Sequence, residues 1–275
     1  MATIATPQTS PTAPSDRDFF LRGAIAIAVT IVTGFSVQLA MGRSSFSSPL
    51  PVHLHAIFFM GWITIYLIQN VLAARGNLSL HRRLGWIAAV WMVPMLVLGI
   101  YVTVAMVRRG QVPFFFQPQQ FLIFDPVALM TFVGLTTAAI VWRRQTDWHK
   151  RLHFCGTSML LGPAFGRLLP LPLLAPWSYE ATVAALMLFP IAGVIADKRR
   201  SGHVHPAWKW GIGTMIASLL VTNAVAYSPL GAAIYQRVAA GSAGANVAPL
   251  GFPPPPAGPR MTGRDGTGQD QAAPR

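Results

Sequence analysis

LPVHLHAIFFMGWITIYLIQNVLAA, residues Leu50–Ala74, contains no Asp, Glu, Lys or Arg. About 20 predominantly apolar residues are enough for a helix to cross the hydrocarbon core of a bilayer. Further apolar blocks of similar length occupy Phe19–Met41, Leu84–Val107, Leu122–Trp142, Leu152–Leu169, Tyr179–Ala196 and Trp210–Leu230. The sequence therefore predicts an all-α integral membrane bundle of seven transmembrane helices between residues 19 and 230.

The composition of the whole chain agrees with this fold class. Of the 275 residues, 53% are hydrophobic and only 11% are charged, which is more apolar surface than one soluble core of this length could bury. Residues 1–18 are rich in Thr, Pro and Ala, and residues 231–275 are rich in Pro and Gly. We expect both terminal segments to be disordered, and the composition argues against a soluble enzyme.

The chain is strongly basic, with a formal net charge of +13. Most of its Lys and Arg residues flank apolar blocks, where they orient helices and meet anionic lipid, so we expect a bilayer as partner and no nucleic acid. In a seven-span topology the loops on one side carry only Arg43, Arg108, Arg109 and Arg167. The positive-inside rule then places the N-terminus in the cytoplasm, and the composition suggests a bacterial inner membrane.

A first group of titratable residues is predicted at the outer face. His53 and His55 begin the second span, and because they point about 200 degrees apart on a helix they cannot share one pocket easily. Asp125, Arg167 and Glu180 are expected at the same depth. His53, His55 and Asp125 are candidate metal ligands, with a helix-start role for Asp125 and an interfacial role for the histidines as the alternatives.

A polar and aromatic stripe continues from His55 along the second span. Its members recur at helical spacing and are Phe59, Trp62, Tyr66 and Gln69. Such a row is expected to face other helices rather than lipid. Arg167, Glu180 and Gln69 are predicted to line a polar pocket, and His55 is expected within contact distance of Asp125 or Arg167.

A second group, His81, His149 and His153, is predicted at the inner face. His149 and His153 are four residues apart and share one helical face, which continues through the small Gly156. Haem b between transmembrane helices uses two imidazole ligands from different helices, and His81 with His149 or His153 meets that condition. We expect His153 to face the bundle, the Lys150–Arg151 pair to stay at the headgroups, and His203 and His205 to face solvent.

The chain resembles a group of uncharacterised bacterial multi-pass membrane proteins. The elements that carry the resemblance lie between about residues 50 and 170 and are His53-Leu-His55, Leu80-His81-Arg82-Arg83-Leu84-Gly85, Asp125-Pro126, His149-Lys150-Arg151-Leu152 and Gly166-Arg167. More loosely, histidines at helix ends followed by Arg and Leu-Gly are similar to those of b-type membrane cytochromes, which implies haem or a redox metal.

Three functions are compatible with these patterns. The first is a haem- or metal-binding membrane protein that handles electrons. The second is a transporter or assembly factor with a polar pocket at the outer face. The third is an accessory subunit that packs against partners in a membrane complex or against copies of itself as a homo-oligomer. No Walker-type Gly-rich loop and no Gly-x-Ser-x-Gly elbow is present, so neither nucleotide-driven transport nor serine hydrolysis is expected.

Overall fold

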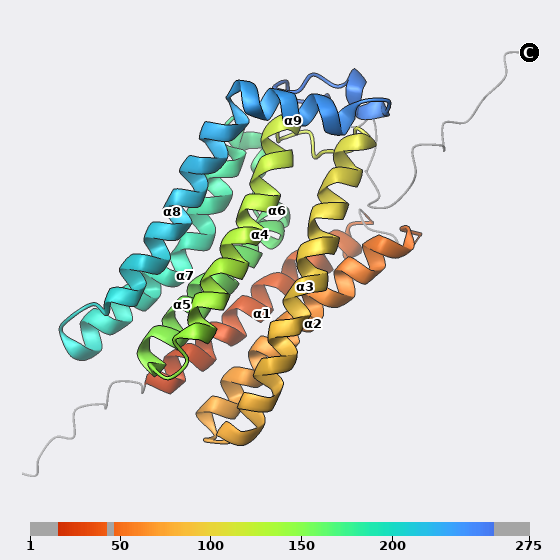
Figure 1. The fold of residues 1–275 in the computed structure, drawn as a ribbon. Helices are drawn as coiled ribbons and strands as arrows, with labels where there is room; N and C mark the ends of the chain where they lie inside the picture. Colours follow the sequence, from red (N-terminus) through yellow and green to blue (C-terminus); the bar gives the residue numbers. More distant parts are fainter. Residues whose placement is uncertain (1–15, 43–46, 256–275) are drawn as a thin grey trace, which may run out of the picture.

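The computed structural model describes residues 16–42 and 47–255, and in these ranges every regular element is a helix. The α-helices are α1 (Asp16–Ala40), α2 (Leu50–Ala74), α3 (Leu78–Arg108), α4 (Pro118–Val141), α5 (Thr146–Ser158), α6 (Gly162–Leu168), α7 (Ser178–Ser201), α8 (Pro206–Ala226) and α9 (Pro229–Ala239), as Figure 1 shows. Short 3-10 turns are η1 (Met159–Leu161), η2 (Leu171–Leu174) and η3 (Ala243–Asn246).

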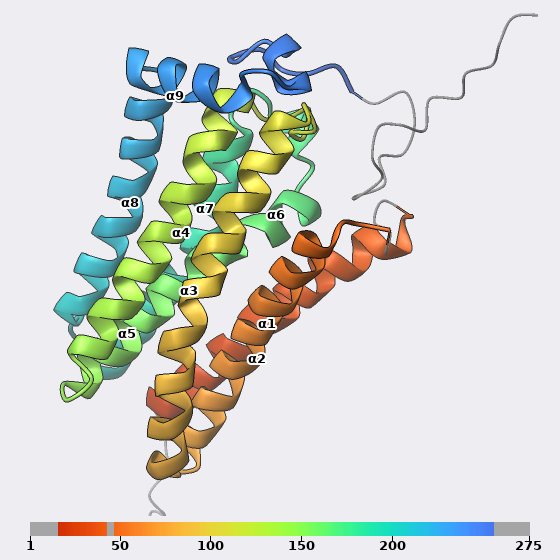
Figure 2. The same cartoon turned by 45° about the vertical axis from the view of Figure 1, so that its right-hand side comes forward.

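The helices form one elongated bundle in which sequential helices pack as neighbours. α2 packs against α3, and α4 packs against both α5 and α8. α1 lies beside α2 and also packs against the short α6. Figure 2 shows the α1–α2 pair leaning away from α4 and α8 toward the end where α9 lies. The buried centre of the bundle includes Trp62, Phe132 and Trp208.

Five of the described helices, α1, α2, α3, α4 and α7, are long and apolar enough to cross a membrane. α8 and α9 would add a sixth span if counted together, although they are bent by 74°. The segment predicted as the fifth span is divided into α5, η1 and α6. Pro163 has no N–H to continue the helix, which accounts for the break beside Gly162.

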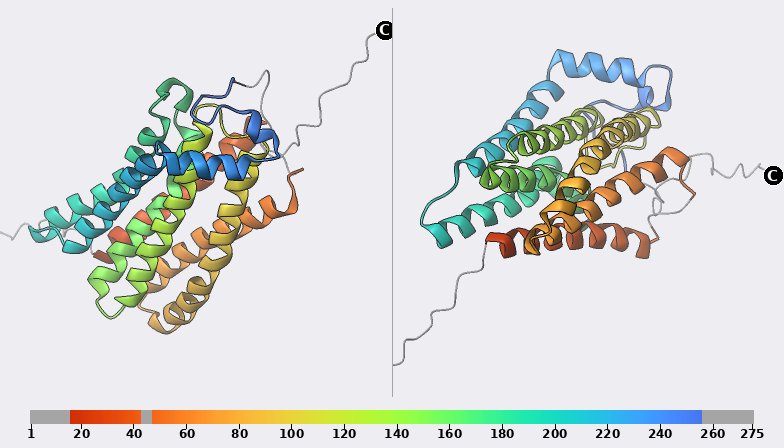
Figure 3. Two further views of the ribbon diagram at one scale, coloured as in Figure 1. Left: turned by 45° about the horizontal axis from the view of Figure 1, so that its top comes forward. Right: turned by 60° about the horizontal axis from the view of Figure 1, so that its bottom comes forward.

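Residues beyond 230 differ from the disordered tail that the composition predicts. α9 lies across the ends of its neighbours (Figure 3), with its N-terminus capped by Ser228, whose hydroxyl accepts from the Gly231 amide. Arg108 Nη1 donates to the Val238 carbonyl at 2.7 Å, and the Tyr235 hydroxyl donates to the Gly244 carbonyl at 3.0 Å. These hydrogen bonds, one of which reaches back to α3, order the segment. The rest of that predicted tail, residues 256–275, lies outside the described residues.

The N-terminal prediction differs by a few residues. α1 begins at Asp16, although residues 1–18 are predicted to be disordered; residues 1–15 lie outside the described part. Asp16 and Asp18 stand in the first turn of α1, where negative charge interacts favourably with the helix dipole. This effect extends the helix slightly ahead of its apolar block.

Candidate functional site

The stripe along α2 faces the interior of the bundle, as the sequence predicts. Trp62 and Tyr66 are only 1% and 5% exposed. The Trp62 ring meets Phe132 of α4 edge to face at 4.8 Å between centroids, and the Gln69 amide donates to the His81 carbonyl of α3 at 3.0 Å. α2 therefore supplies one continuous interior surface that reaches from the outer group of residues to the inner group.

The inner histidines come together in a row. The rings of His81 on α3 and His149 on α5 are 6.1 Å apart between centroids, and the rings of His149 and His153 are 5.7 Å apart. Both neighbouring pairs are close to perpendicular. The sequence could predict the second pair from its spacing, whereas the first pair depends on how α3 and α5 pack in three dimensions.

Hydrogen bonds to main-chain carbonyls fix which ring nitrogen of two of these histidines carries the proton. His149 Nδ1 lies 2.8 Å from the Ala139 carbonyl, and His81 Nδ1 lies 3.3 Å from the Gln69 carbonyl. A carbonyl oxygen can only accept, so each Nδ1 donates its N–H, and in a neutral imidazole the lone pair is then on Nε2. Ligating histidines in proteins are commonly oriented in this way.

His153 lies deeper along the same face of α5. Its ring stacks against Trp62 and Tyr66 at 5.8 and 5.3 Å between centroids, and its Nδ1 is 3.5 Å from the Thr157 hydroxyl. A methyl group added to Gly156, on the next turn, would approach Leu135 of α4 to 3.3 Å. The expectation that His153 faces the bundle, with close helix packing at Gly156, is confirmed.

One residue of the basic pair beside these histidines, Arg151, is placed differently from the prediction. Arg151, expected at the headgroups, is 5% exposed because its guanidinium is bound by the buried carboxylate of Asp197 through two hydrogen bonds of 2.9 Å. Asp197 also accepts from the Trp208 indole N–H at 2.9 Å. A hydrogen bond from Lys150 lowers the pKa of Asp147 to about 2, and Arg151 adds to this effect. This cluster joins α5, α7 and α8.

The two histidines after α7 differ from each other. His203 is exposed, as predicted. His205 is half-buried and caps α8, because its Nδ1 accepts from the Ala207 amide at 3.2 Å. Burial lowers the pKa of His205, and the nearby positive charge of Arg151 contributes to the same shift. The prediction of a solvated His205 overlooked its position directly before the first residue of α8.

The outer residues centre on Asp125 and Arg167. The Thr103 hydroxyl of α3 donates to Asp125 Oδ2 at 3.2 Å. The Arg167 guanidinium lies 4.2 Å above the ring of Phe35 and donates to the Pro163 carbonyl at 2.7 Å. The charges of Asp125 and Arg167 interact electrostatically without a direct ion pair between these two described side chains.

His55 approaches this outer group from α2. Its ring stacks on Phe59 at 4.2 Å between centroids. It is also close enough to Arg167 for their charges to interact. Its Nδ1 is buried without a hydrogen-bond partner. His53, two residues earlier, is turned to another side of the helix by the helical geometry.

Two predicted members of the polar pocket belong elsewhere. Glu180 of α7 accepts a hydrogen bond from Asn223 of α8 at 3.1 Å, and Asn223 in turn accepts from Gln120 of α4 at 3.0 Å. Gln69 pairs with His81 at the other end of α2. Similar depth in the membrane was a poor guide to adjacency, because depth says nothing about which helices are neighbours.

The predicted metal set of His53, His55 and Asp125 is not formed either. Within residues 16–42 and 47–255, no group of three or more His, Cys, Asp and Glu residues is placed to hold a metal ion. The cause is geometric: the two histidines diverge around α2, and Asp125 is hydrogen-bonded to Thr103 on α3.

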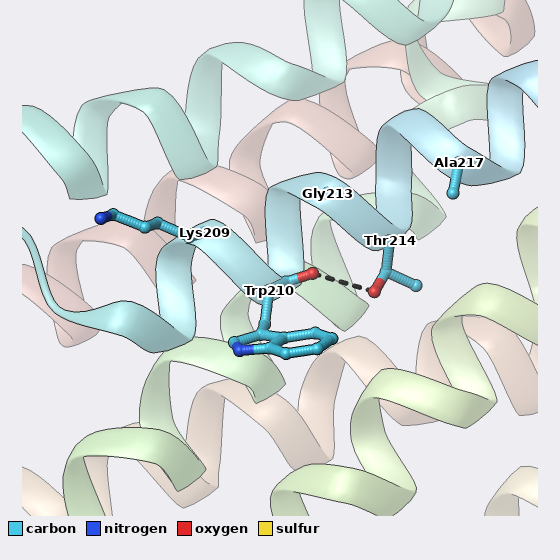
Figure 4. A pocket seen from close by; sticks show the side chains of 5 residues that line it. All are labelled: Lys209, Trp210, Gly213, Thr214 and Ala217. Atoms are coloured by element: carbon cyan, nitrogen blue, oxygen red, sulfur yellow. Dashed lines mark hydrogen bonds between the residues drawn. The ribbon is translucent and has the colours of Figure 1, made fainter.

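A hollow on α8 lies apart from these residues. Figure 4 shows that its lining comes from one helix, and its residues are Lys209, Trp210, Gly213, Thr214 and Ala217. The Thr214 hydroxyl is already bonded to the Trp210 carbonyl at 2.9 Å. None of the predicted site residues contributes to this hollow.

Comparison with protein-family models, with curated proteins and with solved structures returned no match to this chain.

Proposed function

We propose that this chain is a haem b-binding protein of the bacterial inner membrane that handles electrons, in which His81 and His149 would hold the haem. The observation that carries the proposal is the pair of imidazoles on α3 and α5, each anchored through Nδ1 to a main-chain carbonyl and each with Nε2 free. A haem role is also what the looser resemblance of the helix-end histidines to those of b-type membrane cytochromes implies.

The ligand count favours haem over a bare metal ion. A structural or catalytic ion such as zinc needs at least three protein ligands, and the described residues offer no such group. Haem brings its own four nitrogens and needs only axial ligands from the protein. When bound, haem would supply a one-electron carrier. His81 and His149 would orient it, and His153 with its aromatic neighbours would border the site on the bundle side.

We further propose seven spans with the N-terminus in the cytoplasm. In this topology α5, η1 and α6 together make one broken span and α8 makes the last, so that α9 lies at the outer surface. The concentration of Lys and Arg at the end of the bundle that holds the inner histidines supports this orientation. Reporter fusions after Arg275 test it: a reporter that is active only in the cytoplasm would contradict the proposed topology.

The haem proposal is tested by absorption spectroscopy on purified protein from cells supplied with a haem precursor. We expect a Soret band and a reduced-minus-oxidised difference spectrum in the wild type, and loss of haem in His81→Ala and His149→Ala. His203→Ala, at an exposed position, and His53→Ala, on a different side of α2, are matched controls that keep haem. A colourless wild type, or equal haem content in all four variants, would overturn the proposal.

A transporter or assembly factor with an outer-face pocket is the second candidate. It is favoured by polar atoms toward the outer end of the bundle that are buried without partners, among them Gln38 Oε1, His55 Nδ1, Arg167 Nε and Glu180 Oε2. Buried polar groups are normally satisfied, so such a cluster is typical of a place where water or a ligand binds. If the purified wild-type protein contains no haem, this second function is favoured over the first.

A further inference from the structure

The outer group holds half-buried charges that the proposed haem site does not use. Asp125 follows Pro118, the first residue of α4, by seven positions. This places Asp125 about 10 Å along the helix from its outer end, at 1.5 Å per residue. Ionisable groups at such a position in a membrane bundle are costly and generally have a function.

Asp125 is only partly satisfied by its surroundings. Within the described structure its one hydrogen-bond partner is the Thr103 hydroxyl, 3.2 Å from Oδ2, whose single proton also has the Gly99 carbonyl within reach at 3.0 Å. The carbonyl of Leu122 also lacks its normal helical donor, because Pro126 has no N–H. With His55 Nδ1 and Arg167 Nε buried without partners, this region has more polar atoms than the protein itself can pair.

The charged and titratable groups around Asp125 come from several helices. Arg167 of α6 and Tyr179 of α7 both interact electrostatically with Asp125, and His55 of α2 interacts with the same arginine. Within the described residues no cation contacts the Asp125 carboxyl group directly, and the Arg167 guanidinium donates to the Pro163 carbonyl instead. No ion pair therefore holds Asp125 in one protonation state.

An apolar layer separates this group from the inner histidines. A methyl group added to Gly99 of α3 would lie 2.6 Å from Leu129 Cδ2 and 3.3 Å from Phe59 Cζ, so α2, α3 and α4 are in close contact there. Along α2, His55 and Tyr66 are separated by about 16 Å of helix. The packing leaves no room between Gly99 and its two neighbours for a connected file of water.

We propose that Asp125 is a proton-binding site that exchanges with the outer face and is closed toward the inner histidines by the layer of Phe59, Gly99 and Leu129. The proton, supplied by water at the outer face, is taken up on the carboxylate, and the neutral acid forms; Thr103 Oγ1 can accept from a protonated Oδ2 while it donates to the Gly99 carbonyl. Release returns the proton along the same route. This site requires no cofactor and is independent of haem binding.

Infrared difference spectroscopy on the protein in lipid nanodiscs tests proton binding directly. A pH step is expected to produce a protonated-carboxyl C=O band that shifts in D2O and disappears in Asp125→Asn. Glu180→Gln is the matched control, since Glu180 is the other half-buried acid of the outer half, and it retains the band. Persistence of the full band in Asp125→Asn would overturn the proposal.

Proton flux into liposomes tests the apolar layer. With a membrane potential imposed by valinomycin and potassium, the wild type is expected to be tight and Leu129→Ala to raise the flux severalfold. Adding Asp125→Asn to that variant is expected to lower the proton flux to the wild-type level. The control is Met130→Ala, on the exposed side of α4, which is expected to leave the flux unchanged. A flux through Leu129→Ala that does not depend on Asp125 would contradict the proposed route. If Leu129→Ala aggregates on size-exclusion chromatography, Phe59→Leu provides a milder opening of the same layer.

Discussion

Replacement of Asp197 by alanine is expected to destabilise the bundle by about 3–5 kcal/mol, the typical cost of removing one partner from a buried ion pair. Asp197 is 2% exposed, and it binds Arg151 through Nε and Nη2 at 2.9 Å each. It also accepts from the Trp208 indole at 2.9 Å. The variant would leave Nε and Nη2 of a 5% exposed guanidinium, and a buried indole N–H, without their acceptor, while Nη1 keeps its bond to Asp147.

Asp147 provides the matched control for this prediction. It binds the same guanidinium at 2.9 Å, but its side chain is 59% exposed. Water screens exposed ion pairs and can replace them, so Asp147→Ala is expected to cost less than about 1 kcal/mol. The contrast between two acids on one arginine isolates burial as the cause.

The assay is unfolding of the detergent-solubilised protein by SDS titration, followed by tryptophan fluorescence. Arg151→Ala/Asp197→Ala is expected to cost less than the sum of the two single variants, because the second deletion removes the orphaned charge. The reasoning would be refuted if Asp197→Ala matched Asp147→Ala within error, or if the two single costs were additive.

Three further outcomes follow from local geometry. Gly193→Ala would force a methyl group into the buried ring of Trp208 and is expected to cost about 1–3 kcal/mol in the same titration, whereas Gly134→Ala, with open space around it, is not destabilising. Gly244→Ala would collide with a main-chain carbonyl near the end of α3, so limited proteolysis should cut the segment after α9 faster than in the wild type. Because the pKa of Asp147 is lowered to about 2, its stabilising effect is present above its ordinary pKa of about 4 and is lost as the pH falls toward 2. The stability difference between wild type and Asp147→Asn should therefore be small at pH 6 and vanish near pH 2.

The membrane-spanning helices were largely predictable because their apolar blocks are bounded by local signals. α2 begins and ends at the predicted Leu50 and Ala74. Proline in its first turn fits a helix start, and a glycine with positive φ, Gly76, follows its end. The broken segment near Pro163 was also visible in the sequence as a short and interrupted block. The number of seven spans and the cytoplasmic position of the N-terminus remain proposals.

The site residues were predictable only where they share one helix. The face common to His149 and His153 follows from their spacing of four residues. The bond between Gln69 and His81, the pairing of Glu180 with Asn223 and the burial of Arg151 all depend on which helices are neighbours. Composition and depth carry no information about which helices are neighbours. The sequence therefore did not predict these three contacts, and it placed Arg151 at the headgroups instead.

The arrangement of the two groups along α2 has a testable consequence for how they act. His55 and Tyr66 belong to one helical face, yet the close contact of Gly99 with Phe59 and Leu129 lies between the outer and inner groups. An apolar layer that excludes water also prevents a proton on one side from being exchanged with the other. Asp125→Asn should therefore leave haem content and its absorption spectrum unchanged, and His149→Ala should leave the carboxyl infrared band unchanged. Loss of both signals in either variant would mean that the two groups form a single site, and the separation inferred from the packing of α2, α3 and α4 would be incorrect.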